Sequence, residues 1–240
     1  MKKSEFIVQD LLSKIYQRQY PDGKLPTQRE LAKAYGVSRY TVQAAVKNLA
    51  DIGVVNLVQG SGIYVREQFR INPLVFNSLT RTPYAKIISK CLEFVQGPAT
   101  ADEAQIFQLP EKAPVWRFLR LRIVDRTIEQ VERSCLPVAL FPDFSATAVE
   151  HSIQAYVEGS GYHISHYMTT YSPHALSRAD AQLLCTKRNS PAMLIRNRAV
   201  LSTGRVFEYS EIIAVDYAVS YIRPYDREIH TARLASAHTC

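Results

Sequence analysis

Two groups of side chains in this 240-residue chain have the types and spacing that specific hydrogen bonding requires. In the first group, Arg39, Tyr40 and Gln43 point away from the apolar stripe of a short predicted helix. Guanidinium and amide groups donate to phosphate oxygens and to base edges, arginine being suited to guanine and glutamine to adenine. This group therefore indicates a surface that contacts DNA.

The second group is a pair of arginines on one predicted strand. Arg120 and Arg122 are two residues apart, so they share a face of the strand with Cα atoms roughly 7 Å apart. Two guanidiniums that close repel each other unless an anion or acidic side chains lie between them. A phosphate held by the arginines, with Glu132 and Glu208 accepting from hydroxyl groups, fits this set. From spacing alone, Arg–Glu pairs on an exposed sheet face are the simpler interpretation.

The helix that carries the first group is one of two capped helices. Thr27 is a good N-cap and Glu30 completes a capping box, which predicts a helix that begins near Gln28. Gly36 can adopt the left-handed conformation that ends a helix. Ser38 then caps the second helix, so the two helices are joined by a tight turn.

The flanking sequence predicts a winged helix-turn-helix. Apolar residues at helical spacing over 7–15 give a first helix, and two apolar runs at 54–58 and 63–65 flank a glycine-rich hairpin tip. A helical packing module without a nucleic-acid role is the alternative. Charge argues against that alternative, because residues 1–70 hold eleven Lys or Arg and six Asp or Glu, which is +5 of the net +7.

The stretch LPTQRELAKAYGVSRYTVQAAVKN (25–48), with the wing that follows, resembles the DNA-binding domain of GntR-family bacterial transcription regulators. The resemblance implies DNA contacts from Arg29, Ser38, Arg39, Thr41, Gln43 and Gly62. Tyr40, which faces outward on the same predicted helix, is added to this set. Helix capping alone also explains Ser38 and Thr41, and hairpin geometry alone explains Gly62. Gln43 replaces an arginine common in the family, which predicts a shifted base preference.

After residue 84 the pattern changes to strands joined by hairpins, with short helices between them, which predicts an antiparallel α+β domain. Strands are expected over 87–95, 115–124, 128–136, 162–171, 193–200 and 206–215, and helices over 152–158 and 177–184. This region is similar to the UTRA effector-binding domain of the HutC-type branch of GntR regulators. The resemblance implies a chorismate-lyase-like sheet, dimerisation through it, and an effector pocket formed by Arg120, Arg122, Glu132, Ser152 and Glu208.

The expected organisation is a DNA-binding domain (1–66), a linker that acts as a hinge (67–83), an effector-binding and dimerisation domain (84–228) and a tail (229–240). The expected function is a homodimeric, ligand-responsive transcription regulator, a repressor of a carbohydrate or related catabolic operon. Its partners would be double-stranded operator DNA and a small anionic effector such as a phosphorylated sugar. The alternative is an enzyme that uses the chorismate-lyase-like domain on a small carboxylate or phosphate.

No cofactor and no metal are expected. His163 and His166 fall on opposite faces of their predicted strand, which disfavours a metal site. No apolar run reaches the roughly 20 residues that cross a bilayer, so a cytoplasmic protein without a membrane partner is predicted.

Overall fold

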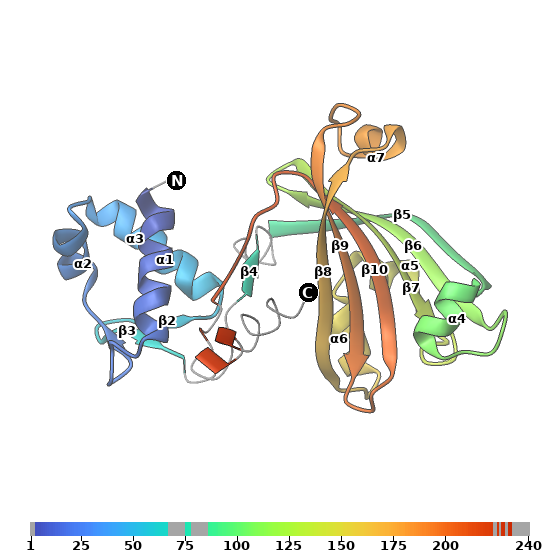
Figure 1. Ribbon diagram of the computed structural model, residues 1–240, viewed down its shortest axis with the longest axis horizontal. Coiled ribbons are helices and arrows are strands. Elements are labelled where there is room, and N and C mark those ends of the chain that lie inside the picture. Colours follow the sequence, from blue (N-terminus) through green and yellow to red (C-terminus); the bar gives the residue numbers. More distant parts are fainter. Residues whose placement is uncertain are drawn as a thin grey trace. The chain divides into compact units, whose positions relative to one another are not determined.

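The chain divides into two units, which Figure 1 shows as ribbons. Residues 1–83 and 218–240 belong to the first unit, and residues 84–217 to the second. This computed structural model describes residues 3–66, 75–77, 86–222, 225, 227, 228, 230 and 231.

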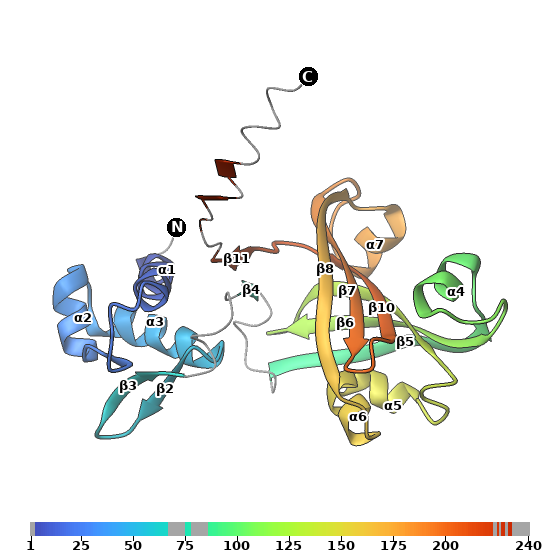
Figure 2. The ribbon, with the colours of Figure 1, turned by 60° about the horizontal axis from the view of Figure 1, so that its bottom comes forward.

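Helices packed on a small sheet form the larger part of the first unit (Figure 2). The helices are α1 (Lys3–Tyr16), α2 (Gln28–Tyr35) and α3 (Arg39–Asp51). The antiparallel sheet has the order β1-β3-β2, with β1 (Lys24–Leu25), β2 (Val55–Val58) and β3 (Gly62–Val65). Leu11, Val46 and Leu49 are fully buried where the apolar faces of the helices meet. The predicted winged helix-turn-helix is confirmed.

A second strand pair belongs to the first unit although its strands are far apart in the sequence. β4 (Val75–Asn77) pairs antiparallel with β11 (Val219–Tyr221). Directly after β11, the partly buried side chain of Ile222 packs against the core of the winged helix. The polypeptide therefore returns to the first unit after it has completed the second.

One six-stranded antiparallel sheet forms the second unit, in the order β5-β6-β7-β10-β9-β8. Its strands are β5 (Ile87–Pro98), β6 (Pro114–Val124), β7 (Thr127–Pro137), β8 (Ile164–Ala175), β9 (Pro191–Leu201) and β10 (Val206–Ala214). Four short helices accompany it, α4 (Ala101–Phe107), α5 (Ala146–Glu150), α6 (Ile153–Gly159) and α7 (Arg178–Leu183). The predicted α+β fold is confirmed.

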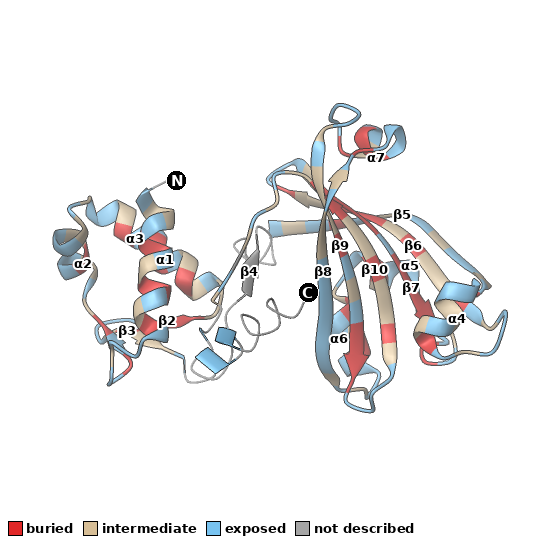
Figure 3. Cartoon of the chain, in the orientation of Figure 1, coloured by how far each residue is buried: buried red, intermediate tan, exposed pale blue. Residues whose placement is uncertain are grey.

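Each face of this sheet has its own core. Figure 3 shows buried segments along the central strands. Phe118 and Phe207 pack with Val149 of α5 and Val157 of α6 on one face. On the other face, Leu121, Val131 and Ile213 pack with residues in and beside α7. Because α5 and α6 cover the first face, side chains that alternate onto it from β6 and β7 are withdrawn from water.

Most predicted elements of the second unit are present, with shifted ends. The strand predicted at 162–171 runs from Ile164 to Ala175, and α4 and α5 were not predicted. The signal for α4 was local, because Thr100 and Glu103 form a capping box in the same way as Thr27 and Glu30. Most of the predicted linker 67–83 and tail 229–240 lies outside the described residues. The predicted second domain extends to 228, whereas the residues after Tyr217 group with the first unit.

Among the described residues, no helix combines the length and the apolar character that spanning a lipid bilayer requires.

Candidate functional site

Caps fix the relative positions of α2 and α3. The Thr27 backbone N–H donates to Glu30 at 2.8 Å, and the Glu30 N–H donates to the Thr27 hydroxyl at 3.3 Å. Gly36 ends α2 with a φ of 60°, in the left-handed region. Ser38 caps α3 by accepting from the Thr41 N–H at 3.2 Å. The polar side chains at the start of α3 therefore project from a rigid turn, as a helix that enters a DNA groove requires.

The predicted DNA-contacting side chains are mostly at the surface of the first unit. Arg29, Arg39 and Gln43 are exposed, and Tyr40 is 81% exposed. A groove of about 530 Å³ runs between the start of α2, the start of α3 and the wing, and Arg29, Arg39 and Gly62 line it together. Ser38 and Thr41 are bonded to each other through their hydroxyls at 2.9 Å, which supports their capping role.

Lys24 is a further cation of this surface that the sequence did not single out. It lies on β1 beside the wing, with Nζ 5.5 Å from the centre of the Tyr64 ring. A Cβ on Gly62, whose φ is 135°, would approach the Lys24 side chain to 3.1 Å. Gly62 therefore leaves room for Lys24 at the wing. The pairing of β1 with β3 creates this contact, and nothing in the local sequence signals it.

The strongest interaction on the helix-covered face of the second unit is a buried ion pair. Arg120 Nε donates to Glu132 Oε2 at 2.7 Å, and Arg120 Nη2 donates to Glu132 Oε1 at 2.8 Å. Both side chains are 4% exposed. Arg120 also donates to the Val149 carbonyl oxygen at 2.9 Å. The cross-strand pair named in the simpler interpretation exists, but its exposed sheet face is wrong because α5 and α6 cover this face.

Arg122 is held less tightly than Arg120. Its Nη1 donates to the Ser89 hydroxyl at 2.8 Å, and its Nε lies 3.7 Å from Glu132. Ser89 is buried on the neighbouring strand β5, directly opposite Arg122 in the ladder, and was not among the predicted site residues. Because Arg120 already neutralises Glu132, Arg122 brings the positive charge that is available to an added anion.

The two glutamates of the cluster have pKa values that move in opposite directions. Burial acts to raise the pKa of Glu132, but the charges of Arg120 and Arg122 outweigh it and hold that pKa below its ordinary value. Burial raises the pKa of Glu208 to about 7, and the nearby charge of Glu132 adds to the rise. Near neutral pH, Glu208 can therefore either donate a hydrogen bond or accept one.

Serines complete the cluster. The Ser134 hydroxyl donates to Glu132 at 3.0 Å, and Ser210 is buried opposite Ser134 on β10. Ser134 was not predicted, although it shares the face of Glu132 by simple alternation. Ser152 uses its hydroxyl to cap α6 by accepting from Ala155 at 3.1 Å. The fold thus brings Arg120, Arg122, Glu132 and Glu208 together, and Ser152 caps α6, one of the two helices on the same face of the sheet. The arrangement can bind a small polar anion.

The raised pKa of Glu208 gives a testable dependence of stability on pH. A carboxyl that binds its proton more tightly when folded stabilises the fold below pH 4.5, and this contribution is lost as the pH rises through about 7. Glu208→Gln has no carboxyl group at this position, so it does not lose this contribution to stability as the pH rises. We expect its unfolding free energy, relative to wild type, to increase by about 2–3 kcal/mol between pH 5 and pH 8. Chemical denaturation at both pH values measures it, with Glu111→Gln, an exposed carboxylate elsewhere, as the control. If the unfolding free energies of Glu208→Gln and wild type differ by the same amount at both pH values, the raised pKa of Glu208 is contradicted.

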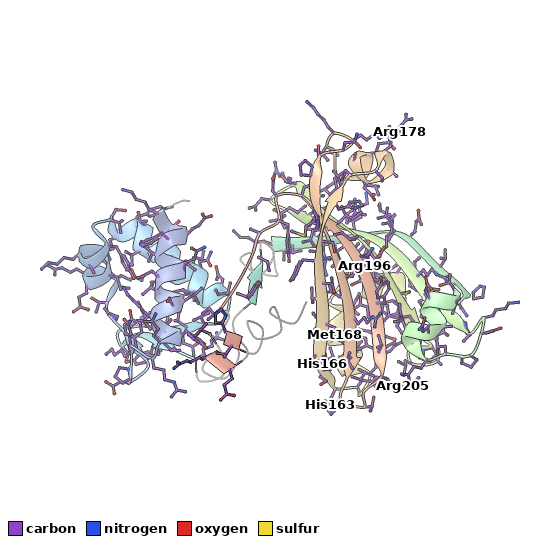
Figure 4. All side chains as sticks on the ribbon, in the orientation of Figure 1. His163, His166, Met168, Arg178, Arg196 and Arg205 are labelled. Atoms are coloured by element: carbon purple, nitrogen blue, oxygen red, sulfur yellow. The ribbon has the colours of Figure 1, made fainter. Side chains whose placement is uncertain are left out.

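A cleft of about 1060 Å³ in the second unit is lined mostly from the opposite face of the sheet, beside α4. Two of its lining carboxylates accept from arginines: Arg117 Nε donates to Glu103 at 2.8 Å, and Arg196 Nε donates to Glu211 at 2.7 Å. Figure 4 shows Arg196 midway along β9. The candidate anion site is on the helix-covered face, where Arg120 and Arg122 both lie beside Glu132.

The described residues contain no group of three or more His, Cys, Asp or Glu side chains arranged to hold a metal ion. Figure 4 shows His163 at the end of β8 and His166 further along this strand.

Comparison with known protein families assigns both units. The family described as "Bacterial regulatory proteins, gntR family" matches residues 3–65, and the UTRA domain matches residues 85–216. The mannosyl-D-glycerate transport/metabolism system repressor MngR of Escherichia coli is 30% identical over 79% of this chain and 81% of its own length. The transcriptional repressor NagR of Bacillus subtilis is 24% identical over 86% of this chain and 87% of its own length.

Solved structures support the same fold. The crystal structure of the possible transcriptional regulator YydK from Bacillus subtilis has a TM-score of 0.56 at 23% identity and covers 90% of this chain and 95% of its own. PhnF from Mycobacterium smegmatis has a TM-score of 0.54 at 20% identity, over 80% of this chain and 87% of its own.

Proposed function

This chain belongs to the GntR family of bacterial regulatory proteins, and from that premise we propose that it represses a sugar-related operon under the control of a small anionic effector. It is a DNA-binding transcription regulator with a UTRA effector-binding domain, and not an enzyme. The sugar-related target is supported by relatives such as the mannosyl-D-glycerate repressor and probable fructoselysine utilization operon repressors.

The observation that carries the effector proposal is the cluster of Arg120, Arg122, Glu132 and Glu208, in which Arg120 and Glu132 are buried and Arg122 and Glu208 are half-buried. Two guanidiniums stand against one carboxylate of lowered pKa and one of pKa about 7, so the cluster retains positive charge at neutral pH. A phosphate can accept from Arg122, while Glu208 can bond to hydroxyl groups. A phosphorylated sugar combines both kinds of group.

The DNA-binding part of the proposal uses the exposed cations around the wing groove. Arg29, Arg39 and Gln43, with Tyr40, Gly62 and the start of α3 at Ser38 and Thr41, would contact the operator. Two copies of the chain would bind a pseudo-palindromic operator as a homodimer, in the cytoplasm where the chromosome lies. The effector would shift the population toward an arrangement with a different operator affinity, since only differential affinity can move such an equilibrium.

The experiment is operator binding measured by fluorescence anisotropy, with DNA from upstream of the chain's own gene. Phosphorylated hexoses and their unphosphorylated counterparts are added in parallel. We expect at least one phosphorylated sugar to change operator affinity at least fivefold, the lower range of typical allosteric coupling, while its unphosphorylated counterpart has no effect. A response to neutral sugars alone would refute the anionic effector, and no binding to any upstream DNA would refute the regulator.

A further inference from the structure

A further carboxylate of the protein lies at the edge of the cluster formed by Arg120, Arg122, Glu132 and Glu208. Glu150, the last residue of α5, accepts a hydrogen bond from the backbone N–H of Cys91 through Oε1, at 3.1 Å. The two residues are 59 positions apart, so the contact joins α5 to the outer strand β5. The Glu150 side chain is exposed, which leaves it free to move without disturbing the core.

The N–H that Glu150 contacts lies at an irregularity of the sheet. The register of β5 against β6 shifts between Cys91 and Glu93, and Cys91 lies directly opposite Arg120. Two residues earlier on β5, Ser89 lies opposite Arg122 and bonds to it. Cys91 and Ser89 therefore lie on the strand next to the two arginines of the cluster, each opposite one of them.

Arg120 contacts the same end of α5, because it donates to the carbonyl oxygen of Val149, the residue before Glu150. Both charges act at Cys91: burial raises the pKa of its thiol, the Glu150 charge raises it further, and the Arg120 charge lowers it. A carboxylate that accepts from a backbone N–H makes one of the contacts that a bound phosphate would make.

We infer that Glu150 is a tethered competitor for the effector's anionic group. In the free protein its carboxylate occupies the Cys91 N–H, and the bound anion takes over that N–H and releases the end of α5. Ser152, which caps α6, follows Glu150 by two residues, so this release acts on the helix that covers the cluster. The site selects an anionic ligand because a neutral ligand gains too little binding free energy at the Cys91 N–H to displace a carboxylate. The inference rests on the proposed anionic effector.

The test is a titration of the full-length protein with inorganic phosphate. Calorimetry measures the phosphate affinity, and hydrogen exchange measures the protection of the Cys91 amide. Glu150→Ala removes the competitor, and Glu150→Gln keeps an acceptor for the N–H without the charge. Asp143→Asn, an exposed carboxylate shortly before α5, is the matched control. We expect Glu150→Ala to bind phosphate about tenfold more tightly than wild type, Glu150→Gln to lie between them, and Asp143→Asn to stay within twofold. The Cys91 amide should exchange faster in Glu150→Ala and become protected again when phosphate is added.

Each other outcome overturns the inference. Equal phosphate affinity in wild type and Glu150→Ala shows that Glu150 does not compete, and an equal gain in Asp143→Asn shows that only overall charge matters. If wild type binds phosphate, Arg122→Ala does not, and the Glu150 variants bind it with wild-type affinity, then the anion site is supported and the role of Glu150 as a competitor is refuted. If no variant binds phosphate, the proposed anionic effector fails together with the inference.

Discussion

Arg120→Ala is expected to destabilise the second unit by about 3–5 kcal/mol, the range measured when one partner of a buried ion pair is removed. Glu132 is 4% exposed and would lose both hydrogen bonds that Arg120 donates to it. The Val149 carbonyl oxygen would also lose its bond to this side chain. Differential scanning calorimetry of the full chain measures the effect as an earlier transition of the second unit.

Arg122→Ala is the matched control for this prediction. Arg122 lies two residues from Arg120 on the same face, but its contact to Glu132 is 3.7 Å long. We expect a much smaller loss of stability, unchanged operator binding, and loss of the response to the effector. Similar destabilisation by both substitutions would show that the arginines form one structural unit. A retained effector response in Arg122→Ala would remove this residue from the site.

Arg39→Ala is expected to weaken specific operator binding by about 1–3 kcal/mol, which corresponds to roughly 5- to 150-fold, if its guanidinium reads a base. Arg39 is exposed at the first turn of α3 and lines the groove beside the wing, so its removal leaves the core of the first unit intact. Anisotropy titrations with operator and with unrelated DNA separate specific from general binding.

An arginine outside the first unit provides the control for charge. Arg188→Ala removes an exposed guanidinium from the second unit and should leave operator affinity unchanged at moderate salt. If Arg39 instead contacts only phosphate, both operator and unrelated DNA should lose affinity equally, and the slope of log affinity against log salt should fall by about 0.9. Unchanged operator binding in Arg39→Ala would exclude it from the interface.

The elements set by contacts three residues apart could be predicted from the sequence. The capping box of Thr27 and Glu30, the glycine at the end of α2 and the cap at Ser38 all involve neighbours in the chain. Strand alternation likewise predicted that Arg120 and Arg122 share a face. These features depend on local geometry, which a single sequence determines.

The remainder depends on register and on what covers the sheet. Whether Arg120 and Glu132 are buried is decided by α5, whose five residues are too few to show a helical period. The position of Ser89 beside Arg122 depends on how β5 and β6 pair, and that pairing shifts register between Cys91 and Glu93. The pKa of Glu208 follows from the same burial, so no spacing argument could have predicted it.

The pairing of β4 with β11 means that the first unit is encoded in two separated pieces, interrupted by the second unit. A chimaera that joins a foreign effector domain to this first unit must therefore keep both junctions between the units, near residues 83 and 218. A hybrid joined only after the wing would lack the returning strand and the packing of Ile222 against the core of the winged helix.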